Sequence, residues 1–126
     1  MRITITWPAG ATTAELRDTP SARAVWNALP VESRAQTWGD EVYFDIGIDL
    51  DLEPDATDVV DAGAVCYWPP GNALAIPYGP TPVSRGDECR LASAATVLGQ
   101  VIGDARAVAT VGPGDTVRVE RAEPAE

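Results

Sequence analysis

Histidine and lysine are both absent from this chain of 126 residues. Without an imidazole, the chain cannot supply a Ser-His-Asp or Cys-His nucleophile, and it cannot offer a histidine-ligated zinc site. Without a lysine, it has neither the phosphate-binding cation of a P-loop nor the amine of a Schiff-base enzyme. Every side-chain cation is therefore an arginine, and several large enzyme classes are excluded.

Basic charge and long apolar runs are also scarce. Nine arginines stand against nineteen acidic residues, which gives a net charge of −10. Nucleic acids and anionic lipid surfaces attract basic patches, so we predict no nucleic-acid partner and no membrane partner. We attribute the acidic excess to solubility, habitat or genome composition before any cationic partner.

The apolar stretches, such as 64–68, are far shorter than the roughly 20 residues of a membrane helix. The N-terminal residues 1–7 alternate like a strand and contain no apolar signal-peptide core. We therefore predict a cytoplasmic protein.

The chain contains two cysteines, Cys66 in an apolar strand pattern and Cys89 in a polar loop. Two thiols in a cytoplasmic chain are usually reduced, and Cys66 is interpreted as a small core residue. Arg90 stands beside Cys89 and favours its thiolate, but no base partner is visible. We assign no catalytic role to either thiol.

No metal and no cofactor are predicted. The alternating acidic residues Asp49, Asp51 and Glu53 suggest calcium at first sight. They lack the glycine and the final glutamate of an EF-hand loop at the required spacing. The alternation with Ile48, Leu50 and Leu52 is interpreted as a strand with a solvated acidic face.

Alternation of apolar and polar residues dominates the rest of the chain and predicts strands. The predicted strands cover residues 2–7, 12–17, 41–46 with a lead-in at 33–38, 48–52, 64–68, 73–78, 97–102 and the surroundings of 117–119. The first two form a hairpin. Gly99 lies inside a strand, which indicates a bulge or a close approach of another backbone.

One clear helix is predicted over residues 20–29. Thr19 is a suitable N-cap and Pro20 a suitable first residue, because the missing N–H costs nothing there. An apolar stripe follows, and Pro30 ends it. We also expect a polar loop at 79–89 and a helical turn at 104–108.

About eight short strands with one helix predict a mainly β fold that is a closed or nearly closed barrel. Closure removes sheet edges that would otherwise be exposed. We expect a single domain over residues 1–121 and a disordered tail at 122–126.

Trp38 and Trp68 are candidate site residues because each borders a turn. An indole held by a stiff turn makes a rigid wall for a pocket, although both could instead plug an end of the barrel. Glu41 and Tyr43 project from one strand face beside Trp38. In an apolar cleft such a carboxyl can act as an acid or base, whereas general burial preferences favour a surface position.

The loop from Gly79 to Ser84 is stiffened by proline and carries hydroxyl groups. Rigid polar loops that follow core strands are common places for recognition, and a purely structural turn is the alternative. The predicted ligand-binding set comprises Trp38, Glu41, Tyr43, Trp68, Pro69, Gly79, Thr81, Pro82 and Ser84.

Four runs in the same order carry a family resemblance. They are Thr-Trp-Gly-Asp-Glu-Val-Tyr-Phe at 37–44, Tyr-Trp-Pro-Pro-Gly at 67–71, Gly-Pro-Thr-Pro-Val-Ser at 79–84 and Ala-Ser-Ala at 92–94. With them the chain resembles the small prokaryotic cyclophilin-like family. The resemblance implies a cyclophilin-type β-barrel with short helices, and no established activity.

Prolyl isomerases of this fold use an arginine, a histidine and a row of aromatic and apolar residues, whereas this chain has no histidine and only one phenylalanine, Phe44. The leading hypothesis is therefore a module that binds a small molecule or peptide in a cleft beside Trp38, Glu41 and Trp68. One alternative is a weak peptidyl-prolyl isomerase without the usual histidine. Another is a regulatory, subunit-type interaction domain with a protein partner or a second copy of the chain.

Overall fold

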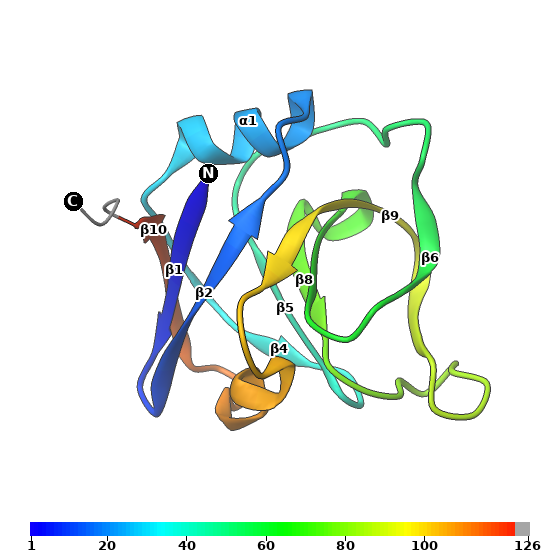
Figure 1. Cartoon of the computed structure of the whole chain (residues 1–126). Helices are drawn as coiled ribbons and strands as arrows, with labels where there is room; N and C mark the ends of the chain where they lie inside the picture. Colours follow the sequence, from blue (N-terminus) through cyan, green and yellow to red (C-terminus); the bar gives the residue numbers. More distant parts are fainter. Residues whose placement is uncertain (123–126) are drawn as a thin grey trace.

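A computed structural model describes residues 1–122. Within this range the chain forms ten strands, one α-helix and two 3₁₀ helices (Figure 1). The elements are β1 (Arg2–Trp7), β2 (Gly10–Leu16), α1 (Pro20–Ala28), β3 (Val31–Arg34), β4 (Gln36–Thr37), β5 (Glu41–Asp45), β6 (Thr57–Val60), β7 (Ala64–Trp68), η1 (Pro69–Gly71), β8 (Ala73–Pro77), β9 (Cys89–Val101), η2 (Ala105–Thr110) and β10 (Thr116–Arg121).

The strands form a nearly closed antiparallel barrel. Their order is β3-β10-β1-β2-β9-β7-β8-β5-β4, with β6 paired to β9 outside this path. The terminal strands of this order, β3 and β4, are separated in the chain by Ala35 alone, so the two ends of the sheet meet. The N–H of Ala35 donates to the carbonyl oxygen of Asp115 at 2.8 Å, which ties this junction to the turn before β10. The predicted mainly β, nearly closed barrel is confirmed.

The barrel interior is filled by the apolar residues that alternate along its strands. Ile3 and Ile5 of β1 and Val117 and Val119 of β10 are all buried in it, as the period of two predicts. The hairpin of β1 and β2 is also as predicted, with Trp7 opposite Gly10 at its tip. Burial of these side chains on one face sets the register, because a slip of one residue would expose them.

Helix α1 lies across one end of the barrel (Figure 1). The Thr19 side chain accepts the N–H of Ala22 at 3.3 Å, and the helix ends at Ala28, one residue earlier than predicted. Trp26 of this helix packs against the core, but it is only partly buried. There the Arg121 guanidinium lies 4.9 Å from the ring centroid, in a cation–π contact.

Strand β9 is the longest and belongs to two layers. Its C-terminal half pairs with β2 and β7 in the barrel, whereas its N-terminal half pairs with β6. At Gly99 the backbones are so close that an added Cβ would lie 2.1 Å from the carbonyl oxygen of Glu15, and the pairing with β7 is irregular there. Both the close approach and the irregularity agree with the prediction for this glycine.

The second layer is an outer ribbon, formed by β6 and residues 89–95 of β9. Alternation along β7 places Val65 and Tyr67 in the barrel interior, whereas Ala64 and Cys66 face the other side. On that side they form a second buried cluster with Ala75, Leu91 and Ala95, the last two of which come from the outer ribbon. The ribbon therefore covers the outer face of β7 and β8 and makes it a buried surface.

Two predictions of local structure are wrong, each for a long-range reason. Residues 48–52 form no strand; the Tyr67 hydroxyl donates to the Ile48 carbonyl oxygen at 2.7 Å and accepts the Leu50 N–H at 3.0 Å. The buried Thr96 hydroxyl accepts the Glu53 N–H in the same way. Hydrogen bonds to side-chain hydroxyls therefore take the place of the backbone hydrogen bonds that a neighbouring strand would make. Strand β9 begins at Cys89 rather than at residue 97, because the unpredicted strand β6 supplies its partner.

The predicted tail at 122–126 lies outside the described residues except for Ala122. The N–H of Ala122 donates to the carbonyl oxygen of Arg2 at 3.0 Å, which extends the pairing of β1 and β10 by one hydrogen bond. In the part of the chain that the structure describes, no helix has the length and apolar character needed to cross a membrane.

Candidate functional site

A pocket of about 210 Å³ opens on the outer face of the barrel, between β5, β7 and the outer ribbon. Its walls are Trp38, Glu41, Tyr43, Trp68, Leu91 and Ala92. Four of the nine predicted site residues, Trp38, Glu41, Tyr43 and Trp68, are thus brought together from two separate segments of the chain. Leu91 and Ala92 were not predicted as lining residues, because the Ala-Ser-Ala run beginning at Ala92 contributed only to the family resemblance.

Glu41 is the polar group at the centre of this site. It is the first residue of β5 and only 6% exposed, and its Oε1 has no hydrogen-bond partner within residues 1–122. Burial raises the pKa of its carboxyl group from 4.5 to about 7. The surface position favoured by general burial preferences is wrong, because the outer ribbon covers this face. A buried carboxyl oxygen without a donor is costly, and native structures contain few such groups.

Tyr43 and Trp68 form two adjoining aromatic walls. Their ring centroids are 6.2 Å apart and their planes are inclined at 67°. The indole Nε1–H of Trp68 donates to the Ser93 hydroxyl at 2.9 Å, which ties the ring to the outer ribbon. A Cβ added at Gly71 would lie 3.2 Å from the indole ring, so the glycine lets the 3₁₀ turn pack closely against it. The Trp-Pro-Pro-Gly segment therefore builds and positions one wall of the pocket.

Trp38 and Glu41 are the two ends of a tight turn, in which the Trp38 N–H donates to the Glu41 carbonyl oxygen at 3.0 Å. Gly39 within this turn has a φ of +57°, and a Cβ there would lie 2.9 Å from Thr81 Cα and Pro82 Cδ. A side chain at this position would therefore meet both a strained backbone and a collision. The predicted loop at 79–84 supports this turn from behind and does not line the pocket.

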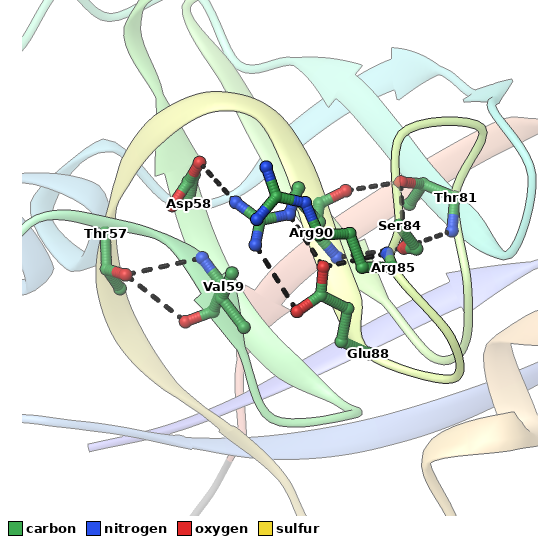
Figure 2. A network of polar contacts seen from close by, with 8 residues as sticks. All are labelled: Thr57, Asp58, Val59, Thr81, Ser84, Arg85, Glu88 and Arg90. Carbon is green, nitrogen blue, oxygen red and sulfur yellow. Dashed lines mark hydrogen bonds and ion pairs between the residues drawn. The ribbon is translucent and has the colours of Figure 1, made fainter.

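The loop is in turn fixed to β9 by a polar network (Figure 2). The Ser84 hydroxyl accepts the Thr81 N–H at 2.9 Å, and the Thr81 hydroxyl donates to the Arg90 carbonyl oxygen. The Arg90 guanidinium binds Asp58 of β6 at 3.0 Å and Glu88 at 2.7 Å. Thr81, Pro82 and Ser84 therefore support the turn of Trp38 and Glu41 from outside the pocket walls, and Gly79 is not among the lining residues either.

Pro69, the remaining predicted site residue, lies in a neighbouring hollow. This second hollow has a volume of about 540 Å³ and also includes Pro70, Ser93, Ala94 and residues 49–52. The two hollows adjoin at the chain steps from Trp68 to Pro69 and from Ala92 to Ser93. The Trp68–Ser93 hydrogen bond spans this boundary, so the indole stands between the two spaces.

The cysteines lie behind the pocket rather than in it. Burial raises the pKa of the Cys66 thiol to about 12, and the charges of Glu41 and Cys89 add to this effect. Burial and nearby carboxylates, including Asp40, also raise the pKa of Cys89, so its surroundings favour the neutral thiol despite the neighbouring Arg90. The guanidinium of Arg90 is directed to Glu88 and Asp58 instead. Among the described residues no cluster of three metal-ligating side chains occurs.

The chain matches the family model described as "Cyclophilin-like" over residues 1–120. It is also similar to the solution structure of the hypothetical protein AF2241 from Archaeoglobus fulgidus, with a TM-score of 0.81 and 38% sequence identity. That similarity covers 97% of this chain and 95% of AF2241. A comparison with curated proteins gives no match. From the family model and the structural neighbour together, the chain belongs to the cyclophilin-like family.

Proposed function

We propose that this protein binds a small molecule or a peptide segment in the pocket formed by Trp38, Glu41, Tyr43, Trp68, Leu91 and Ala92. The observation that carries the proposal is the buried Oε1 of Glu41, which has no donor in the described chain. A fold that keeps such a group between aromatic walls loses stability for it. A ligand that donates a hydrogen bond to this oxygen, or places a positive charge against it, would offset that loss of stability.

The walls favour binding because they are concave, mostly apolar and braced from outside. Ligand sites in proteins typically combine apolar and aromatic walls with a few placed polar groups. Here the loop at 79–84 fixes the turn of Trp38 and Glu41, and Ser93 fixes Trp68. Little ordering is then required when the ligand enters, which reduces the entropic cost of binding.

Prolyl isomerisation is supported less well than binding. The described residues that line the pocket include no arginine to stabilise the twisted amide. Arg106 lies nearby, but it is 5.5 Å from the Tyr78 ring and 3.9 Å from the Asp40 carboxylate, outside the pocket walls. A proline-peptide assay separates the two functions: we expect rates equal to the uncatalysed blank, and acceleration would favour the enzyme.

Tryptophan fluorescence provides the direct test, with a library of metabolites and short peptides as probes. A ligand in the pocket should change the emission of wild-type protein and of a Trp26→Phe control, whose indole lies on α1. The response should be much smaller in Trp38→Phe and Trp68→Phe. If every probe leaves the spectrum unchanged, or if the response survives in both pocket variants, the proposal is wrong.

A further inference from the structure

We propose that the ligand group taken up by this pocket is an organic cation whose nitrogen carries apolar substituents, that is, an alkylated ammonium. This inference rests on the proposed binding function and adds the chemical class of the ligand. Three observations support it: the aromatic walls, the single charged group among them, and the charge of the surroundings.

The aromatic walls suit a rounded cation better than a flat neutral ring. The faces of tryptophan and tyrosine carry partial negative charge and attract cations within about 6 Å of the ring centroid. Tyr43 and Trp68 are inclined at 67°, so their planes do not form a parallel slot for a stacked aromatic ligand. Trp38 adds a third aromatic side chain to the same walls. A compact alkylated ammonium can contact several such rings at once.

Among the described lining residues, Glu41 alone carries a charge, and that charge is negative. An anionic ligand would be repelled by the ionised carboxylate, and a purely apolar ligand would bring Oε1 neither a hydrogen bond nor an opposite charge. A primary ammonium brings three N–H donors and needs as many acceptors. The lining side chains provide only Glu41 and the Tyr43 hydroxyl as oxygen acceptors. An alkylated ammonium fits better, because most of its surface is apolar.

The surroundings also favour the approach of a cation. The chain has a net charge of −10, and the adjoining hollow carries the exposed carboxylates of Asp49 and Asp51. Such a field raises the local concentration of cations at the entrance. No lining residue within the described range supplies a positive charge that would oppose it.

A matched pair of probes tests the inference. Choline carries a trimethylammonium group, and 3,3-dimethylbutan-1-ol has the same shape with a neutral carbon in place of the nitrogen. We expect isothermal calorimetry at about pH 8 to show choline binding at least tenfold more tightly than the alcohol, as a desolvated cation–π and charge contact implies. Glu32→Gln, which removes an exposed carboxylate from β3, should bind choline like the wild type.

Two pocket variants complete the test. Glu41→Gln should bind choline about tenfold more weakly than wild type, because the shape is kept and the charge is lost. Tyr43→Leu keeps the carboxylate but removes one aromatic wall, so it should weaken choline and leave the weak binding of the alcohol unchanged. If Glu41→Gln does not fold, Tyr43→Leu still decides the question.

The results separate the inference from the function on which it rests. Equal affinity for choline and its neutral analogue would overturn the inference that the ligand is a cation, and so would unchanged choline affinity in both pocket variants. If choline fails to bind while another probe changes the fluorescence of Trp38 or Trp68, the inferred class of ligand is wrong and the proposed binding function stands. If neither choline nor any library member binds, both proposals fall.

Discussion

Replacement of Glu41 by glutamine should remove a large part of the pH dependence of stability. Burial raises the pKa of the folded-state carboxyl from 4.5 to about 7. The folded protein therefore holds this proton more tightly than the unfolded chain, and stability from this source is complete below about pH 4.5 and lost as the pH rises through about 7. Each pKa unit corresponds to about 1.4 kcal/mol, so the ionised carboxylate costs about 3 kcal/mol above that range.

The measurement is the free energy of unfolding by urea for wild type, Glu41→Gln and the exposed control Glu32→Gln, between about pH 4 and about pH 8. Over this interval the wild type should lose about 3 kcal/mol relative to Glu41→Gln, because other titrating groups cancel in the difference. A constant offset from the buried amide also cancels. The control should follow the wild type.

Other titratable groups near Glu41 do not account for such a difference. Tyr43 shares its pocket, the thiols of Cys66 and Cys89 interact with it electrostatically, and Asp40 is beside it in the chain. The raised pKa of Cys66, about 12, and the raised pKa of Cys89 keep both thiols neutral in this interval. Parallel curves for wild type and Glu41→Gln would refute the reasoning, since they would mean that the carboxyl is solvated.

Three further predictions concern the packing at Gly99, the irregular segment 48–53 and ligand binding. Gly99→Ala should destabilise the fold by about 2 kcal/mol or more in urea unfolding, because its Cβ would lie 2.1 Å from the Glu15 carbonyl oxygen; an unchanged midpoint would contradict this close approach. Tyr67→Phe should lower the free energy of unfolding by about 1–3 kcal/mol and speed hydrogen exchange of the Leu50 amide. Slow exchange in the variant would contradict the hydrogen bond from the Leu50 N–H to the Tyr67 hydroxyl. Choline should bind about fivefold more weakly at about pH 6 than at about pH 8, because protonation of Glu41 removes most of the carboxylate charge; a flat profile in calorimetry would contradict this.

Much of the barrel follows from the sequence alone. Alternation along 2–7 and 117–119 predicted which side chains fill the interior, because a strand of period two presents one face to the core. Thr19 and Pro20 predicted where the helix begins, since capping is a property of neighbouring residues. The turns beside Trp38 and Trp68 marked both indoles as candidate pocket walls, with a plug at the end of the barrel as the alternative, and both line the pocket.

Tertiary structure alone decided which groups meet in the pocket and how they are charged. Alternation shows that Glu41 leaves the barrel interior, but only the outer ribbon of β6 and residues 89–95 turns that outer face into a buried one. The same ribbon buries Cys89 and brings Leu91 against Trp68, although neither contact has a local signal. Residues 48–52 have the alternation of a strand, yet the hydroxyl of the distant Tyr67 binds their backbone instead. In each case the deciding partner is remote in the chain, and local patterns carry no information about such partners.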